Sequence, residues 1–422
     1  MLFRSTNQLA RKTDEEGHST YYDYSPVGNL IKETWANGNE IVYRYDDADR
    51  RTGATDSLGT LWSAGYDADG NETRETDALG NSATHVYDAL SRRVESHLPE
   101  SRDLAFGYAA TGNLVSETDA NGNVTGHEYD ALNRRLRSYD SLGTRWRGSY
   151  DAVGNLETET DANGNIVRHS YDAHNRRTGS SDAIGVRFTA GFDGVGNKTT
   201  ETDANGNVSR YTYDFRNQLQ SVTRAGVQLN RYEYDEVGNV AFVTDARGNK
   251  TGYEYDGRNL RIAENAPLAA IHKTAYDAMG DAVLLTDPEN RKTTQAYDLR
   301  RRLVAITNGA GEITRQTYDD NGNLTVVTRP LGNESRRGFD AANRLVSVTT
   351  AAGTAHLGYD GNGNLVSRTD ANGNESRYVF DARNRRVRSI RADGTEERID
   401  YDGNGNPAKL RDGRGNVIEF GY

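Results

Sequence analysis

An aromatic residue returns every 21 residues along this 422-residue chain. The series starts at Phe3, and a single step of 20 residues occurs in it, from Phe339 to Tyr359. We call these positions the phase residues; they divide the chain into 20 units that begin between Phe3 and Tyr401. A fixed period of about 20–50 residues indicates a solenoid, a propeller or another array of stacked units. The members on which the register most depends are Tyr45, Tyr66, Tyr87, Tyr129, Tyr150, Tyr171, Tyr213, Tyr234 and Tyr255.

Each unit carries two turn signals. Asp follows the phase residue in 17 of 20 units, as at Asp130, Asp151 and Asp172, and it opens an Asp-x-x-Gly-Asn or Asp-x-x-Asn-Arg sequence. Gly stands fourteen places after the phase residue in 16 of 20 units. Asp, Asn and Gly favour turns through side-chain bonds to the backbone and through positive φ. These residues therefore have a predicted structural role, which we extend to Gly122, Gly164 and Gly206.

Successive units alternate between two kinds, so a period of 42 residues lies over the period of 21. One kind reads Asp-Ala-Val-Gly-Asn after Tyr150 and Asp-Ala-Asn-Gly-Asn ten residues later. The other reads Asp-Ala-His-Asn-Arg-Arg after Tyr171 and Asp-Ala-Ile-Gly ten residues later. The alternation holds from Phe3 to Tyr401, and no shift in composition marks a domain boundary. We expect one continuous repeat region over residues 1–422.

The stretches between turns have the period of β-strands. About six residues separate successive turns, which is the usual strand length. In the stretch 208–213, Tyr211 and Tyr213 fall on one face and Arg210 and Thr212 on the other. The sequence predicts an all-β fold: a long antiparallel ribbon of some 40 short strands, with Tyr rings stacked along one face. Contacts between neighbouring units should dominate its stability, without long-range closure.

Two other repeat architectures deserve comparison. Four strands per 42 residues also fit a β-propeller blade of about 40–45 residues. Ten blades, however, exceed the usual range of about four to eight, and the Gly-His and Trp-Asp blade marks are absent. The parallel coils of a β-helix would not require a hairpin turn about every ten residues. The antiparallel ribbon accounts for the turns best.

Composition excludes several classes of protein and of site. The net charge is -11, which argues against a general nucleic-acid binder. There is no Cys, so the chain has no disulfide, zinc–thiolate site or Cys nucleophile. The sequence contains no run of about 18 apolar residues that would span a membrane as a helix. The first residues lack the apolar segment of a signal peptide.

The candidate catalytic and metal-binding groups have simpler structural explanations. Glu157, Glu159 and Asp161 would share one face of a strand and could act as acid and base, but such a row is more typical of a solvated face. The Asp-Ala-Asn-Gly-Asn loops have the oxygen-rich start of a calcium loop, but Gly stands fourth and not sixth. His169 and His174 are separated by a turn. We predict no catalytic residue, no metal site and no cofactor.

Paired Arg residues recur every 42 residues in part of the chain. Arg134-Arg135 and Arg176-Arg177 are two of these pairs. Asp and Glu lie close to them in the sequence, so the pairs are expected to form salt bridges between strands. The alternative is that Arg134, Arg135, Arg176 and Arg177 contact a ligand or an enclosed cargo.

The repeat resembles that of the YD-repeat, or RHS-repeat, family. Tyr129-Asp130-Ala131-Leu132-Asn133-Arg134-Arg135-Leu136 is close to a family consensus, and so is Tyr150-Asp151-Ala152-Val153-Gly154-Asn155-Leu156. The resemblance covers the whole chain. It implies a β-ribbon that spirals into a hollow shell, as in bacterial polymorphic toxins, in the C components of insecticidal toxin complexes and in teneurins.

The resemblance also implies a function. The chain would be a non-catalytic shell segment that encloses a C-terminal toxin, outside the cell or at its surface after export by a dedicated secretion system. Partners would be the toxin cargo or the remainder of the shell, together with secretion components. The family's closing segment, with its Asp-Pro-x-Gly motif and autoprotease Asp, has no match here, and Asp287-Pro288 occupies a turn inside a repeat. The alternative is an adhesion module in which exposed Tyr, Asn and Arg bind glycans.

Overall fold

The computed structural model describes residues 2–3 and 8–422. These residues form 41 β-strands in a single sheet, together with two short 3-10 segments. Every strand pairs antiparallel with the next strand along the chain, from β1–β2 to β40–β41. The predicted all-β antiparallel ribbon is therefore confirmed.

The strands are short and evenly spaced. Those of the first half of the chain are β1 (Leu2–Phe3), β2 (Leu9–Thr13), β3 (Ser19–Tyr24), β4 (Leu30–Thr34), β5 (Glu40–Tyr45), β6 (Arg51–Asp56), β7 (Gly59–Tyr66), β8 (Glu72–Asp77), β9 (Ser82–Tyr87), β10 (Arg93–Leu98), β11 (Arg102–Tyr108), β12 (Leu114–Thr118), β13 (Val124–Tyr129), β14 (Arg135–Asp140), β15 (Gly143–Tyr150), β16 (Leu156–Asp161), β17 (Ile166–Tyr171), β18 (Arg177–Ser181), β19 (Val186–Phe192), β20 (Lys198–Asp203) and β21 (Val208–Tyr213).

The same spacing continues to the end of the chain. The remaining elements are β22 (Leu219–Arg224), β23 (Val227–Tyr234), β24 (Val240–Asp245), β25 (Lys250–Tyr255), β26 (Arg261–Ala266), η1 (Pro267–Ala269), β27 (Ala270–Tyr276), β28 (Ala282–Thr286), β29 (Lys292–Tyr297), β30 (Leu303–Thr307), β31 (Ile313–Tyr318), β32 (Leu324–Thr328), η2 (Pro330–Gly332), β33 (Glu334–Phe339), β34 (Leu345–Thr350), β35 (Gly353–Tyr359), β36 (Leu365–Thr369), β37 (Glu375–Phe380), β38 (Arg386–Ile390), β39 (Glu396–Tyr401), β40 (Pro407–Arg411) and β41 (Val417–Glu419).

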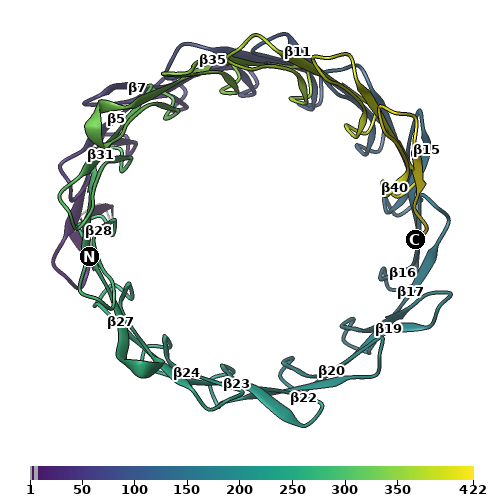
Figure 1. The fold of residues 1–422 in the computed structure, drawn as a ribbon, viewed down its shortest axis with the longest axis horizontal. Helices are drawn as coiled ribbons and strands as arrows, with labels where there is room; N and C mark the ends of the chain where they lie inside the picture. The colour runs from purple at the N-terminus through teal and green to yellow at the C-terminus, as the bar shows by residue number, and fades with distance from the viewer. Residues whose placement is uncertain (1, 4–7) are drawn as a thin grey trace.

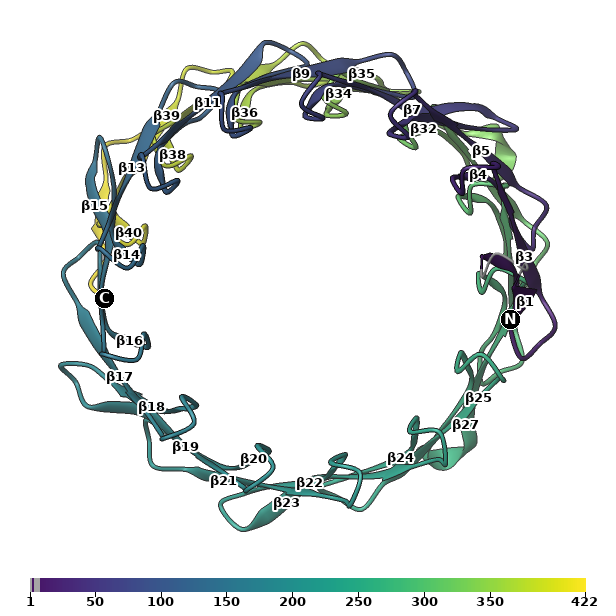
Figure 2. The same cartoon turned by 180° about the vertical axis from the view of Figure 1, so that it is seen from behind.

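The ribbon curves into a ring around a hollow centre and passes its own start (Figure 1). Seen from behind, the purple and blue N-terminal strands lie beside the green and yellow strands of the later chain (Figure 2). Residues 14–163, here called the early segment, contact residues 257–404, the late segment. The two segments lie side by side along a shared edge, which we call the seam.

The sheet is one layer thick, and its buried core is small. Among the described residues the buried apolar side chains are Ile41, Ala54, Ala83, Val167, Ala263 and Val327. Exposure alternates along the strands as expected: in β21, Tyr211 and Tyr213 are half-buried while Arg210 and Thr212 are exposed. Strand pairing, turn geometry and rows of side chains, more than a thick core, hold such a wall together.

Candidate functional site: the seam of the wall

Most units of the described chain contain two kinds of β-turn, and an opening Asp builds both by the same local chemistry. The tyrosine turn follows the phase residue, and the middle turn comes about ten residues later. In the tyrosine turn 130–134, the N–H of Asn133 donates to the Asp130 carbonyl, and the Asp130 carboxylate accepts from the N–H groups of Leu132 and Arg134. Asn133 has φ 61°, a left-handed conformation that Asn tolerates. Asp151 and Asp172 open their turns in the same way.

The predicted glycines occupy the matching place in the middle turns. Gly122, Gly164 and Gly206 have φ 81°, 89° and 80°. Each sits three residues after an Asp whose carbonyl accepts its N–H. A residue with a Cβ would be strained in this conformation, which explains the frequency of Gly fourteen places after the phase residue.

Most phase tyrosines bond across their hairpin to the strand that precedes their own. The hydroxyl of Tyr45 donates to the carbonyl oxygen of Leu30 at 2.8 Å, and that of Tyr150 donates to the carbonyl oxygen of Arg135 at 2.9 Å. A bond to the residue fifteen positions earlier recurs through most of the chain. Among the predicted residues it is made by Tyr45, Tyr66, Tyr87, Tyr150, Tyr171, Tyr213, Tyr234 and Tyr255.

The first Arg of each pair joins two neighbouring hairpins. The Arg134 Nε lies 2.7 Å from Asp130 Oδ2, its Nη1 donates to the Asp151 carbonyl, and its guanidinium covers the Tyr150 ring at 4.8 Å. Arg176 makes the same contacts with Asp172, Asp193 and Phe192. These residues are half-buried links inside the wall.

The second Arg of each pair is more exposed. Arg135 lies over the Trp146 ring at 5.1 Å, and Arg177 lies over Phe188 at 5.3 Å and contacts His169. Contact of these Arg residues with cargo stays a prediction, as does stacking between Tyr rings.

Two buried ion pairs hold the seam. Arg300 donates from Nε and Nη2 to the two carboxylate oxygens of Asp56, at 2.7 Å each. Arg383 likewise donates from Nε and Nη2 to the two carboxylate oxygens of Asp140, at 2.7 and 3.1 Å. The Asp56 side chain is 0% exposed and that of Asp140 is 3% exposed. Two-pronged Arg–carboxylate pairs are strong and geometrically specific.

The pKa values of these two carboxyl groups are lowered. Burial alone would raise the pKa of Asp56, but hydrogen bonds from Arg300 and from the Leu58 N–H outweigh burial, so the pKa lies below its usual value. For Asp140, burial is again opposed by Arg383, by the Leu142 N–H and by the charge of Arg145, and the pKa is lowered too. Both carboxylates are therefore charged at neutral pH.

Between and beyond the ion pairs, Asp and Asn side chains exchange hydrogen bonds across the seam. Asn121 donates to Asp360 at 3.0 Å, and Asn362 donates back to Asp119 at 2.7 Å. The next reciprocal pair is made by Asn163 with Asp402 and by Asn404 with Asp161. Asn321 donates to Asp77 at 2.6 Å. Each contact joins a middle turn of the early segment to a tyrosine turn of the late segment.

The backbones approach each other closely at two of these contacts. A Cβ built on Gly361 would lie 2.5 Å from the Ala120 carbonyl oxygen, and one on Gly403 would lie 2.5 Å from that of Ala162. Such distances are too short for an alanine without movement of the backbone. Gly194 has the same place in a unit outside the seam and would meet nothing within 4 Å. At Gly361 and Gly403 the approach of the early segment therefore leaves no room for a Cβ without such a movement.

The candidate catalytic groups contact one another and their neighbours in the wall. His169 is buried, its Nε2 lies 3.3 Å from Glu159 Oε1, and Trp146 also donates to Glu159. The Nδ1 atoms of His85 and His127 each lie 3.0 Å from the hydroxyl of a buried serine, Ser96 and Ser138 respectively. His174 lies in a turn, away from His169.

Among residues 2–3 and 8–422, no group of three or more His, Asp or Glu could hold a metal ion. Within that same part of the chain, no helix is long and apolar enough to cross a membrane.

Sequence reasoning missed the seam and expected contacts between neighbouring units only. That expectation is wrong, because Asp56 and Arg300 are 244 residues apart. A signal was present in the third residue of the tyrosine turns. Early units carry Val27, Leu90 or Leu132 there, whereas late units carry Arg300, Asn321, Asn362, Arg383 and Asn404.

The structure is a curved, single-layer ribbon of antiparallel hairpins whose early and late segments bond edge to edge. These features are those of a β-ribbon shell protein. A family model described as RHS Repeat matches nine segments, at residues 24–61, 66–102, 108–145, 150–186, 192–226, 231–270, 276–313, 318–355 and 359–396. These segments make up most of the chain, which therefore belongs to the RHS-repeat family. Among curated proteins, none matches the sequence.

Solved structures with the same fold include crystal structures of TcdB2-TccC3 complexes. The chain is similar to TcdB2-TccC3-Cdc42 with a TM-score of 0.66 and 14% identity, over 99% of this chain and 29% of that one. The values for TcdB2-TccC3 are 0.63 and 13%, over 99% and 32%. This chain thus spans about a third of the length of those chains. At such identity the likeness shows the shared fold.

Proposed function

We propose that this chain is a wall segment of a hollow RHS-type shell in a toxin or effector-delivery protein. Its work is to enclose a polypeptide cargo and to keep proteases and targets away from it. The wall acts sterically and not as a catalyst. The observation that carries the proposal is the seam, because it turns a curved ribbon into a continuous surface around a hollow centre.

The composition of the wall suits enclosure. A one-layer sheet with few buried apolar residues leaves both faces lined with polar and aromatic side chains. Arg135 and Arg177 are exposed on the wall, so we assign them, among the predicted Arg residues, to cargo contact. Arg134 and Arg176 bond to the carbonyls of neighbouring hairpins, so we assign them a structural role in the wall.

We also propose the extent of the repeat region, its partners and its location. Residues 1–422 act as one repeat region, and their partners are a toxin cargo and further parts of a shell. Work outside the producing cell, after export by a dedicated secretion system, follows from the RHS-repeat membership and is part of the proposal.

A protease-protection assay tests enclosure. A small, well-folded reporter is fused after Tyr422, and its cleavage by a broad-specificity protease is compared with cleavage of the free reporter. We expect slower cleavage of the fused reporter, and loss of that protection in an Arg300→Ala/Arg383→Ala variant, whose seam is opened. Equal cleavage of fused and free reporter would contradict enclosure. If the chain without the reporter then bound glycans on an array, an adhesion module would be favoured.

A further inference from the structure

The ion pairs of the seam are interrupted at one position. Alternate tyrosine turns of the late segment carry Arg as their third residue, and this Arg reaches an Asp of the early segment. The pairs are Asp14–Arg258, Asp56–Arg300 and Asp140–Arg383, with N–O distances of 3.9, 2.7 and 2.7 Å. The equivalent position between the last two pairs holds Leu98 and Ala342. Both charged side chains are therefore missing there, and Ala342 is too short to fill the place of an Arg.

A cavity of about 610 Å³ lies at this position of the seam. Its apolar lining includes Trp62 and Leu98 of the early segment and Ala342 of the late segment. Beside it, the Ala341 N–H donates to Glu100 Oε1 at 3.2 Å, so the two segments stay in contact. Sites for small molecules usually have volumes of about 300–1,000 Å³, with apolar walls and a few polar groups. The cavity has the size and the mixed lining of such a site.

The charged groups that line the cavity are mostly acidic. Glu72, Glu75 and Asp77 contribute three carboxylates, and Arg102 contributes one guanidinium. Arg102 is already engaged, because its Nε donates to the Gly361 carbonyl at 3.0 Å. An excess of carboxylates favours an occupant with a positive charge.

The Trp62 ring lacks the cation that covers equivalent rings elsewhere. In three other units, the Arg six places after the phase residue lies over an aromatic ring of the next strand. These pairs are Arg93–Phe106, Arg135–Trp146 and Arg177–Phe188, at 5.1–5.4 Å. Trp62 has the repeat position of Trp146, but Arg51 lies over Tyr43, at 4.2 Å. Within residues 8–422, no Lys or Arg covers the Trp62 ring.

The identity of one neighbouring residue explains this difference. The residue two places before the phase residue is Tyr43 in this unit. In the other three units it is His85, His127 or His169. A guanidinium over a Tyr ring is a favourable contact. Arg51 therefore stays on its own hairpin, and Trp62 is left facing the cavity without a cation.

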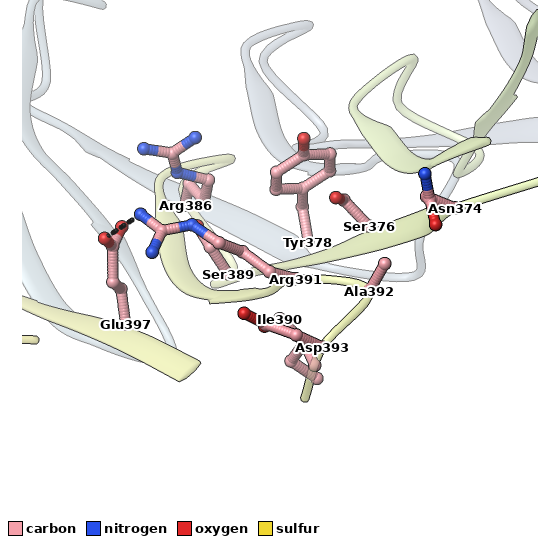
Figure 3. A pocket seen from close by; sticks show the side chains of 10 residues that line it. All are labelled: Asn374, Ser376, Tyr378, Arg386, Ser389, Ile390, Arg391, Ala392, Asp393 and Glu397. Atoms are coloured by element: carbon pink, nitrogen blue, oxygen red, sulfur yellow. Dashed lines mark hydrogen bonds and ion pairs between the residues drawn. The ribbon is translucent and has the colours of Figure 1, made fainter. Parts of the chain in front are cut away.

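A second cavity, outside the seam, shows the same preference (Figure 3). Its volume is about 650 Å³. Arg386 lies over Tyr378 at 5.7 Å, in the same relation as Arg51 and Tyr43, and Arg391 bonds to Glu397. There the chain's own guanidinium groups occupy both the ring and the carboxylate. In the seam cavity, Trp62 has no such partner.

We propose that the seam cavity binds a small organic cation with an apolar body, of the arylalkylammonium class. The ammonium group lies over Trp62, as the guanidinium of Arg135 lies over Trp146, and Glu75 supplies a countercharge. The apolar body packs against Leu98 and Ala342. Aromatic rings with nearby carboxylates are a recurrent means of binding ammonium ions. The site is part of the wall and does not depend on the enclosure of cargo.

Isothermal titration calorimetry of the full chain tests the class of ligand. The probe is 2-phenylethylammonium, and its neutral and anionic counterparts are 2-phenylethanol and 3-phenylpropanoate. We expect the ammonium ion to bind at least about fivefold more tightly than the alcohol, and the carboxylate to bind more weakly than both. An ammonium ion that does not bind, or that binds no more tightly than the alcohol, would overturn the proposal.

Two variants test the location. Leu98→Asp/Ala342→Arg rebuilds the ion pair of the neighbouring positions and fills the cavity, so binding of both the ammonium ion and the alcohol should be lost. Glu75→Gln keeps the cavity and should weaken binding of the ammonium ion alone, by at least about threefold. Glu117→Gln is the matched control, 42 residues later at the same repeat position, and should change neither. Circular dichroism checks that each variant is folded. Binding that survives filling of the cavity, or equal effects of the two Gln variants, would contradict the assignment.

Discussion

Arg300 and Asp56 are separated by 244 residues and form a two-pronged ion pair in which the Asp56 side chain is 0% exposed. Arg300 also donates to the Asp320 carbonyl in its own segment at 3.0 Å. One guanidinium therefore fixes a tyrosine turn of the late segment, its neighbouring hairpin and a middle turn of the early segment relative to one another.

Arg300→Ala should weaken the seam strongly. It leaves a buried carboxylate without its partner, and breaking a buried ion pair from one side costs about 3–5 kcal/mol. Urea unfolding followed by circular dichroism measures the loss. Asp56→Ala and the double variant complete a cycle, and their coupling isolates the pair. Arg291→Ala is the control, because Arg291 pairs with Asp287 in an exposed middle turn outside the seam and its loss should leave unfolding unchanged. Equal effects of Arg300→Ala and Arg291→Ala would contradict the assignment.

Gly403→Ala should also open the seam, for a steric reason. The new methyl group would lie 2.5 Å from the Ala162 carbonyl oxygen, and overpacking of this kind costs about 1–3 kcal/mol. Hydrogen exchange of the backbone around 161–165 should become faster. Gly194→Ala introduces the same methyl group at the same repeat position outside the seam and should leave exchange as it is. The prediction fails if both variants exchange alike.

The seam should survive mild acid. The folded-state pKa values of Asp56 and Asp140 are lowered, so their stabilising effect is complete above the unfolded-state pKa of about 3.9. It is lost as the pH falls through the still lower folded-state values. A fluorescent donor and acceptor on the two segments should report contact at pH 4 and separation only in stronger acid. Asp56→Asn/Asp140→Asn should remove this acid step, whereas Asp47→Asn, at an exposed position, should preserve it.

His169 should give the wall a second and milder pH dependence. Burial and the nearby charge of Arg177 lower the pKa of His169 in spite of Glu159. The folded chain therefore prefers the neutral ring, while the unfolded chain binds a proton near pH 6.5. Stability should be highest above that pH and fall as the pH drops below it.

His169→Tyr tests the assignment, because Tyr211 occupies the same repeat position 42 residues later. The difference in unfolding midpoint between the natural chain and the variant should change between pH 8 and pH 5. A difference that is constant over this range would rule out a contribution from His169.

The local fold was predictable because each unit repeats the same residues, which act through contacts inside that unit. Tyr45, Asp130 and Gly122 each show a function within a single hairpin: a hydroxyl bond, an Asp-stabilised turn and a positive φ. The seam was not predictable in this way. Where Asp56 meets Arg300 depends on small rotations summed over more than twenty strands, which no local pattern encodes. Only the change from Leu90 and Leu132 to Arg300 and Arg383 at equivalent positions indicated it.

The alternation of two kinds of unit restricts how such a wall can change in length. The seam joins units that are twelve steps apart, as those opening at Tyr45 and Tyr297 are, so Arg-bearing turns always meet middle turns of one kind and Asn-bearing turns the other. Insertion of one unit between the early and late segments would exchange these partners at every later contact. Insertion of two would keep every Arg-bearing and Asn-bearing turn opposite the kind of middle turn that it meets now. Genes for such walls should therefore gain and lose repeats in pairs, in steps of 42 codons.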